Sequence, residues 1–463
     1  MRNLSVLLIS TYELGRQPFG LASPAAWLRA DGHSVQLLDL SRQKLDEATV
    51  RAADVIAFFL PMHTATRLAL PVIRNARALN PRAHLCAYGL YAPVNSDLLR
   101  RIGVATILGG EFESGLRSLA RRLSAMKGEI AQVPQNESEI SLERLEFLVP
   151  DRTGLPPLDK YAHLTLPDGS TRVVGYTEAS RGCKHRCRHC PIVPVYNGKF
   201  RIVARDVVLE DIRQQVAAGA QHITFGDPDF FNGPTHATEI VQTIHQEFAD
   251  LSYDVTVKVE HLLDHRDLLP VLRETGCAFI TTAVECVDDR VLRLLDKGHS
   301  RSDFIDLAKL MRAVGLFLVP TFVPFTPWTT LEGYEDLLRT ITTLELVKNV
   351  PPVQLTMRLL IPAGSRLLEV TDLYGVELEA FERELLVYPW RNPDPRVDQL
   401  QHQLEKLVQQ ESKKGSGRGE VFAQIWKRAQ GAKGTDGSQH PLPKIPVTAA
   451  RATIPYLTEP WYC

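Results

Sequence analysis

The chain has 463 residues, of which 44% are hydrophobic, 23% charged and 7% aromatic, and its formal net charge is −1. This composition is typical of a globular protein with two or three domains, and the charge argues against a dedicated nucleic-acid or anionic-membrane surface. No apolar run approaches the roughly 20 residues that span a bilayer. The first residues enter a strand pattern without a signal-peptide cleavage site, so we expect a cytoplasmic protein.

Residues 1–125 alternate strand and helix patterns. Continuous apolar strands separated by helices predict a doubly wound parallel sheet of the flavodoxin-like type, covered on both faces. Ligands of such sheets bind beyond the carboxyl ends of the strands, where Gly89, Gly109, Gly110 and Glu111 lie. Glycines there would let the backbone approach a bulky ligand closely. The expected strands are 5–10, 34–39, 54–60, 84–88 and 105–108.

The remaining chain divides into three parts. Residues 126–170 are polar and proline-bearing, which predicts a linker with one acidic amphipathic piece at 137–147. Residues 171–390 alternate strands and helices again. Residues 391–463 predict a helical extension. The expected strands of the second part are 172–177, 222–225, 254–259, 278–283, 316–323 and 353–358. The extension is expected to hold helices at 395–410 and 420–429, a flexible basic joint at 413–419 and a mobile stretch at 431–444.

Three cysteines, Cys183, Cys187 and Cys190, form a C-x3-C-x2-C run just after the strand at 172–177. Thiolates are soft ligands that suit iron–sulfur clusters or zinc. A cubane cluster has four irons, so three thiolates leave one iron open. Tetrahedral zinc needs a fourth ligand, which His185 or His189 could supply. We favour a cluster over zinc.

The other cysteines carry less information. Cys86, Cys277 and Cys286 lie in apolar strand-like runs and are expected to be buried core thiols. Seven cysteines with three clustered predict a reduced protein with a metal site, and they do not suggest a disulfide framework.

The cysteine motif and the six strand–helix units after it resemble the radical S-adenosylmethionine (SAM) enzymes and their partial (β/α)6 barrel. The resemblance implies a [4Fe-4S] cluster on the three cysteines whose open iron chelates SAM. An electron from a flavodoxin- or ferredoxin-type donor would then cleave SAM to a 5′-deoxyadenosyl radical. The resemblance places SAM contacts at His189, Gly226, Asp227, Asp229, Glu285, Pro362 and Gly364.

Ordinary structural roles compete with these SAM assignments. The 226–229 segment is also typical of a β-turn, and Glu285 is also a strand-end carboxylate suited to a salt bridge. Lys258 and Glu260 indicate a SAM contact only weakly. Phe325, Trp328 and Arg358 could face the substrate, which the sequence does not identify.

The first part resembles the cobalamin-binding domain that precedes the barrel in many radical SAM enzymes. Gly89 and the Gly109-Gly110-Glu111 turn stand where that family carries glycine-rich loops. The family's Asp-x-His-x-x-Gly motif is missing, so no histidine is placed to ligate cobalt from below. His63 is expected to be a loop hydrogen-bonder. The domain therefore binds cobalamin without that ligand or has lost the cofactor.

Three functions follow from these alternatives. With cobalamin, the chain would transfer methyl groups to a small molecule or natural-product intermediate. Without it, the same barrel would perform a rearrangement or another group transfer. A non-catalytic zinc or iron–sulfur binding protein is the third reading. We expect a small-molecule substrate, no nucleic-acid or membrane partner, and a monomer or weak dimer.

The chain ends Thr458-Glu-Pro-Trp-Tyr-Cys463. This ending resembles the tails of a poorly characterised radical SAM group that carry Cys or selenocysteine before Ala-Glu-Pro. One hypothesis is that the tail folds over the barrel mouth and presents Cys463 to substrate or metal. The alternative, a packed aromatic tail with an idle thiol, is slightly preferred.

Overall fold

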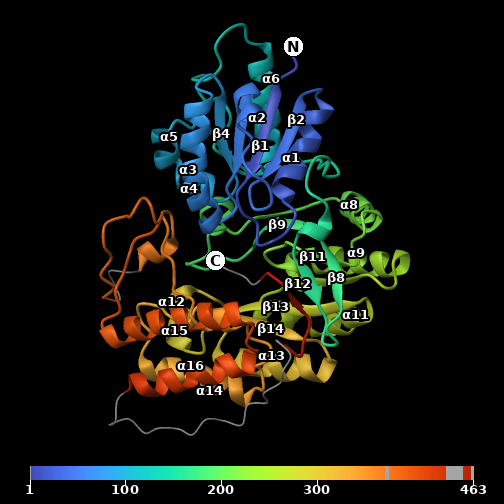
Figure 1. The fold of residues 1–463 in the computed structure, drawn as a ribbon. Coiled ribbons are helices and arrows are strands. Elements are labelled where there is room, and N and C mark those ends of the chain that lie inside the picture. Colours follow the sequence, from blue (N-terminus) through green and yellow to red (C-terminus); the bar gives the residue numbers. More distant parts are fainter. Residues whose placement is uncertain (1, 371–374, 434–451, 460–463) are drawn as a thin grey trace.

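The computed structural model describes residues 2–370, 375–433 and 452–459. An N-terminal α/β unit sits above a second, curled sheet, and two C-terminal helices lie beside the second sheet (Figure 1). The predicted fold class is confirmed: a parallel-sheet unit precedes a partial barrel with a helical extension. The residues at 434–444 in the predicted mobile stretch and the tail residues Trp461 to Cys463 lie outside the described part of the chain.

The N-terminal sheet has six strands in the order β2-β1-β3-β4-β5-β6, and all its pairings are parallel. Its strands are β1 Ser5–Ser10, β2 Ser34–Asp39, β3 Val55–Phe59, β4 His84–Tyr88, β5 Thr106–Gly110 and β6 Ile140–Ser141. The helices are α1 Phe19–Ala30, α2 Glu47–Ala52, α3 His63–Leu79, α4 Tyr91–Val94, α5 Ser96–Arg101 and α6 Phe112–Ala125.

Both faces of this sheet are buried, which explains why its strands are apolar without a polar alternation. In β1, Leu7 and Ile9 face one hydrophobic cluster, and Val6 and Leu8 face the other. The two clusters arise because successive side chains of a strand point to opposite faces. Helices therefore cover the sheet on both sides (Figure 1).

The segment at 137–147, predicted as an amphipathic piece, forms no helix. Ile140–Ser141 instead pairs as β6 with the end of β5, and Gly109 N–H donates to the Glu139 carbonyl at 2.7 Å. The free backbone edge of β5 offers donors and acceptors, and pairing them stabilises an extended conformation over a helix. After β6 the chain forms the 3-10 helix η1 Leu158–Lys160 and then the strand β7 His163–Thr165.

The second sheet has the order β14-β13-β12-β11-β8-β7-β15. Its parallel strands are β8 Thr171–Thr177, β11 His222–Phe225, β12 Ser252–Thr256, β13 Cys277–Glu285 and β14 Leu318–Phe322. β7 and the C-terminal β15 Tyr456–Leu457 add antiparallel strands at one edge. A small separate hairpin pairs β9 Ser180–Gly182 with β10 Phe200–Ile202.

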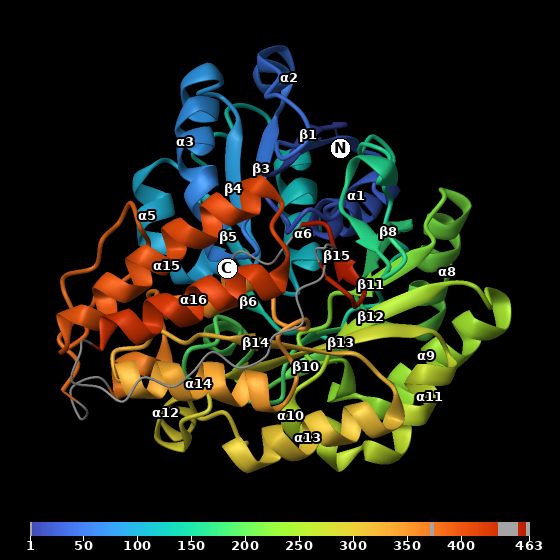
Figure 2. The ribbon, with the colours of Figure 1, turned by 60° about the horizontal axis from the view of Figure 1, so that its bottom comes forward.

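Helices cover the outer face of this sheet (Figure 2). They are α8 Arg205–Ala217, α9 Pro234–Glu247, α11 Leu269–Glu274, α12 Asp289–Leu295, α13 Arg301–Val314 and α14 Leu331–Thr343. Shorter elements at the strand ends are α7 Val193–Tyr196, η2 Phe230–Asn232, α10 Val259–Asp264 and η3 Arg266–Leu268.

The segment expected to form a sixth parallel strand is mostly not a strand. Pro352–Leu355 is a 3-10 helix, η4, and only Arg358 makes a single parallel bridge, with Phe325. Pro351 and Pro352 lack the backbone N–H that a strand donates to its neighbour. The barrel therefore closes less far than six full strands would allow.

The C-terminal extension consists of α15 Pro395–Lys414 and α16 Arg418–Ala432, which pack on each other, and α16 also packs on α14 (Figure 2). The predicted flexible joint is a tight turn, in which Gly415 caps α15 with φ 74°. A further 3-10 helix, η5 Arg366–Glu369, precedes the extension. None of the helices in the described ranges is both long and apolar enough to cross a membrane.

Candidate functional site

The cysteine loop runs from β9 to β10 at the carboxyl end of β8. The β9–β10 hairpin closes its base, where Cys183 N–H donates to the Lys199 carbonyl at 3.1 Å. Arg188 N–H donates to the carbonyl of Leu295 in α12 at 2.9 Å. On the other side, Ser365 Oγ donates to the Arg188 carbonyl at 3.2 Å. The loop is thus held by its own hairpin, by α12 and by the turn that contains Pro362 and Gly364.

Cys187 is buried, and Cys183 and Cys190 are half-buried. Burial raises the pKa of Cys183 to about 11 and that of Cys190 to about 12, so both are neutral thiols until a metal displaces their protons.

Gly226 and Asp227 support the cysteine loop from behind. Asp227 is buried and accepts hydrogen bonds from Ala179 N–H at 2.9 Å and Ser180 Oγ at 2.6 Å, just ahead of the loop. Burial raises the pKa of Asp227 to about 7. A Cβ at Gly226 would lie 1.8 Å from the Tyr176 hydroxyl oxygen, so only glycine fits here. The structure therefore gives both predicted SAM residues a role in placing the loop.

Glu285 ends β13 and lies between His189 and Lys297. Its Oε1 is 3.1 Å from His189 Nε2 and 3.1 Å from Lys297 Nζ. Burial by itself would raise the pKa of Glu285, but Lys297 and His189 hold it well below its usual range. The residue has φ 68°, a strained conformation outside glycine. A buried strained carboxylate beside the cysteine loop is typical of a functional position.

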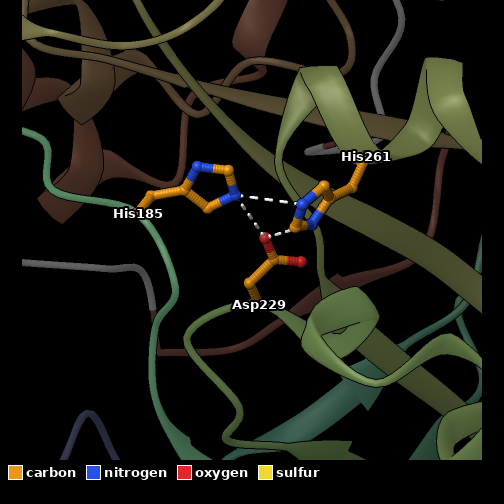
Figure 3. A group of neighbouring side chains, drawn as sticks. All are labelled: His185, Asp229 and His261. Atoms are coloured by element: carbon orange, nitrogen blue, oxygen red, sulfur yellow. Dashed lines mark hydrogen bonds and ion pairs between the residues drawn. The ribbon is translucent and has the colours of Figure 1, made fainter. Parts of the chain in front are cut away.

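His185, Asp229 and His261 converge on the other side of the loop (Figure 3). Asp229 Oδ2 lies 2.6 Å from His261 Nδ1 and 3.9 Å from His185 Nε2. The two histidine Nε2 atoms are 3.0 Å apart. Burial, and then the charge of Lys258, lower the pKa of His185 to about 4. Glu260 accepts from Lys258 at 3.2 Å and lies 3.7 Å from His185 Nδ1.

A buried ionic cluster joins the two domains beside the cysteine loop. Arg181 in β9 donates to Glu113 through both terminal nitrogens, at 2.9 and 2.7 Å. It also contacts Glu111 at 3.4 Å and Glu178 at 2.7 Å. The Tyr196 hydroxyl donates to Glu111 at 3.0 Å. Burial raises the pKa of Glu111 to about 7, with Arg181 opposing the shift. Glu111, which was predicted to contact cobalamin, therefore joins the N-terminal domain to the barrel through Arg181 and Tyr196.

The predicted glycine loops lie close to the domain's own backbone. A Cβ at Gly89 would lie 2.8 Å from the Leu60 carbonyl oxygen, and one at Gly110 would lie 2.1 Å from the Ser141 carbonyl oxygen. A Cβ at Gly109 would meet Pro93 at 2.3 Å. Internal packing thus accounts for all three glycines, and their contact with cobalamin remains a prediction.

His63 begins α3, and its Nε2 lies 2.6 Å from the Leu385 carbonyl oxygen. This is the loop hydrogen bond expected for His63. Because that nitrogen already has a partner, His63 is not placed as a cobalt ligand.

A cavity of about 940 Å³ connects the two units. Arg67 in the first turns of α3 borders it on the N-terminal side, and Thr281 and Thr321 border it inside the curled sheet. Helices α15 and α16 and the segment at 455–459 complete its wall. Arg358, expected near the substrate, borders this cavity, where it pairs with Asp398 at 2.6 Å.

The other two residues expected at the substrate, Phe325 and Trp328, are not among those bordering the cavity. Phe325 is fully buried against Tyr334, with ring centroids 4.9 Å apart. Phe325 is therefore a core residue.

The segment at 452–459 bridges both units. Its strand β15 pairs with β7, and Thr458 N–H donates to the His163 carbonyl at 2.8 Å. Glu459 pairs with Arg42 of the N-terminal unit at 3.2 Å. The described part of the tail therefore reaches the junction of the two units, while Cys463 lies beyond the described residues.

Sequence patterns did not indicate two of these residues. Arg181 and His261 act through partners far away in the chain, and such pairings leave no local pattern. His261 directly follows Glu260, at the same sheet edge as Asp229, and this shared edge is the signal that would have found it.

Residues 177–341 match the family model of the radical SAM superfamily. The hopanoid C-3 methylase of Methylococcus capsulatus is 24% identical over 337 residues, which cover 70% of this chain and 64% of that protein. A tRNA-2-methylthio-N(6)-dimethylallyladenosine synthase of Haemophilus influenzae is 26% identical over 204 residues, which cover 40% of this chain and 41% of the synthase. The chain thus spans less than two thirds of these curated relatives.

Two solved structures share most of the fold. The cobalamin-dependent SAM radical enzyme OxsB with aqua-cobalamin bound gives a TM-score of 0.68 at 14% identity, covering 89% of this chain and 67% of OxsB. The radical SAM methyltransferase TsrM from Kitasatospora setae, with tryptophan and a SAM analogue bound, gives 0.61 at 16% identity, covering 82% and 79%. At these identities the likeness establishes the fold.

Proposed function

We propose that this radical SAM enzyme, whose radical SAM domain at residues 177–341 follows a B12-binding-like parallel-sheet domain, uses a [4Fe-4S] cluster and SAM. It transfers a methyl group to a small molecule with the help of cobalamin. One observation carries the proposal: three thiols of one loop lie at the carboxyl ends of the barrel strands, and both histidines of that loop face other partners.

Cys183, Cys187 and Cys190 would hold the cluster. Such a cluster supplies one electron to the sulfonium of SAM when both are bound. His185 Nε2 lies against His261 and His189 Nε2 against Glu285, so these two nitrogens already have partners other than a zinc ion. This arrangement favours a cluster with one open iron over a closed zinc shell.

Glu285, His189 and Lys297 would bind the polar groups of SAM. His189 Nδ1 is buried and has no hydrogen-bond partner among the described residues, so it is available to a ligand. Lys297 is almost fully buried and offers a cation for a carboxylate. The turn with Pro362 and Gly364 sits against the cysteine loop, as a contact near the adenine would require. Asp227 would act indirectly, by holding the start of the cysteine loop through hydrogen bonds from Ala179 and Ser180.

Cobalamin would occupy the cavity between the two units. The cavity reaches from Arg67, near the carboxyl end of the N-terminal sheet, to the barrel interior. Hopanoid C-3 methylase and TsrM are methyl-transferring proteins, and OxsB was solved with aqua-cobalamin. When bound, cobalamin supplies a methyl group that the cavity wall would hold in front of the substrate. The substrate, a small molecule, would occupy the barrel side of the cavity near Arg358.

Cobalamin-free radical chemistry is the second candidate, and one observation favours it. Gly110 packs against the Ser141 carbonyl, and Glu111 is bound to Arg181 and Tyr196. A rearrangement or another group transfer would need the same cluster and SAM site. Cobalamin content of the purified protein distinguishes the two candidates.

The test is anaerobic reconstitution with iron and sulfide, followed by iron counting and EPR with and without SAM. We expect a four-iron signal that SAM perturbs, that is lost in Cys187→Ala and that persists in the matched control Cys286→Ala. Hydroxocobalamin is offered in parallel, and its retention after desalting supports methyl transfer. Tight zinc binding without cluster formation would overturn the proposal.

A further inference from the structure

Three side chains from separate elements meet beside the cysteine loop (Figure 3). Asp229 was predicted as a SAM contact, but SAM cleavage and methyl transfer give no role to the three as a group. His185 comes from the loop itself, Asp229 from the turn after β11, and His261 from α10 after β12. One ligand atom from each lies within 4.8 Å of the others. Among the described residues this is the only such group of histidine, cysteine and carboxylate side chains.

The donors are enclosed and poorly satisfied by one another. Asp229 is fully buried, and His261 is nearly so. Asp229 Oδ2 and His261 Nδ1 are 2.6 Å apart, yet neither has a partner with hydrogen-bond geometry among the described residues. A buried carboxylate oxygen left in this way costs free energy unless a cation compensates it. Both atoms point to a shared occupant.

The nearest fixed cation does not compensate Asp229. Lys258 Nζ pairs with Glu260 Oε2 at 3.2 Å, on the far side of His185. Lys258 is therefore engaged by Glu260. Two imidazoles and one carboxylate make up the donor set.

We propose that His185, Asp229 and His261 form a binding site for a divalent first-row transition-metal ion, separate from the cluster cysteines. Two histidines and one carboxylate with open positions are the set that binds non-haem iron(II) and related ions. Metal–ligand bonds of about 2.0–2.2 Å require ligand atoms roughly 3–4 Å apart. His185 Nε2 and Asp229 Oδ2, 3.9 Å apart, fall in this range, and one atom from each of the three side chains lies within 4.8 Å of the others. His261 faces Asp229 with Nδ1 at 2.6 Å and His185 with Nε2 at 3.0 Å, and only one of these nitrogens would bind the ion.

The site goes beyond the proposed function and does not depend on it. Its ligands come from the barrel and the cysteine loop, and none is a cluster thiol. The ion would lie next to the cluster and would link the loop at His185 to the ends of β11 and β12. It would retain coordination positions for water or a substrate oxygen.

Cobalt(II) is the probe. The full chain is reconstituted with its cluster, equilibrated anaerobically with Co2+ and desalted, and cobalt and iron are counted per chain. We expect one cobalt beside four irons, with high-spin Co(II) EPR. His261→Ala and Asp229→Asn each should weaken cobalt binding at least tenfold and leave the iron count intact. His265→Ala is the matched control and should bind as the wild type, because this neighbour lies outside the group, with its ring centroid 6.2 Å from that of His261.

Each outcome decides the proposal. Cobalt lost in both site variants and kept in the control supports it. No bound cobalt, equal binding in the variants, or a thiolate-to-cobalt charge-transfer band overturns it, and the three side chains are then a hydrogen-bonded chain. If His261→Ala also loses iron from the cluster, the cobalt binding of Asp229→Asn decides the proposal. Iron counts and the EPR response to SAM come from the same samples, so the radical SAM proposal stands or fails separately.

Discussion

Asp227 shows how one buried carboxyl can couple loop placement to pH. Its pKa of about 7 lies far above the usual 3.8 because of burial, so the folded chain holds a proton there that the unfolded chain releases. That contribution to stability is complete below the unfolded pKa and is lost as the pH rises toward 7.

We therefore expect Asp227→Asn to flatten the pH dependence of unfolding. Between pH 4 and 7 the wild type should lose stability more steeply than the variant, by up to about 1.4 kcal/mol per pH unit. Urea unfolding of the apo-protein at several pH values measures the difference. Asp206→Asn, whose side chain is 94% exposed, is the control and should follow the wild-type profile. Parallel profiles for Asp227→Asn and the wild type would contradict the prediction.

Gly226 tests the packing behind the same loop. Gly226→Ala would force its methyl group into Tyr176, and overpacking of this kind costs about 1–3 kcal/mol. Chemical unfolding should show the loss, together with reduced iron incorporation. Gly431→Ala in α16 is the matched control, because nothing lies within 4 Å of its Cβ, and we expect no loss there. Equal stability of the two variants would argue against a tight contact at Tyr176.

The strand β9 contains Arg181, which forms buried ion pairs with three carboxylates. Arg181→Leu would leave the carboxylates of Glu111, Glu113 and Glu178 without their shared cation. Removing one partner of a buried ion pair costs about 3–5 kcal/mol. We expect this loss in urea unfolding, and partial recovery in Arg181→Leu/Glu113→Gln. A loss below 1 kcal/mol would show that the carboxylates are neutral or solvated.

Elements were predictable where the pattern is local. The apolar runs of β1 and β3 and the cysteine spacing are each contained in a few residues, and they lie where expected. The strand expected at 353–358 fails because Pro351 and Pro352 directly precede it and begin a 3-10 helix, and the piece at 137–147 fails because the open edge of β5 pairs with it. The pairs Arg181–Glu113 and His185–His261 join residues 68 and 76 positions apart, and no local pattern encodes them.

For the molecule as a whole, the C-terminal segment is the part that covers the cavity. Ending the chain after Arg451 removes β15 and the Glu459–Arg42 pair. Amide hydrogen exchange at 163–165 should accelerate, since β7 loses its partner. Ending the chain after Glu459 is the control: it keeps β15 and should leave exchange unchanged, and it also removes Cys463. Unchanged exchange in the shorter chain would show that β15 does not protect β7.

The buried contacts of Arg181 also decide how this protein can be divided. A barrel expressed alone would expose a guanidinium fitted to three carboxylates, two of which belong to the other domain. The N-terminal domain alone would retain Glu111 and Glu113 without their cation. Recombining either domain with one from a relative therefore requires matched residues at all these positions. The two domains therefore have to be exchanged together, although each has its own sheet and core.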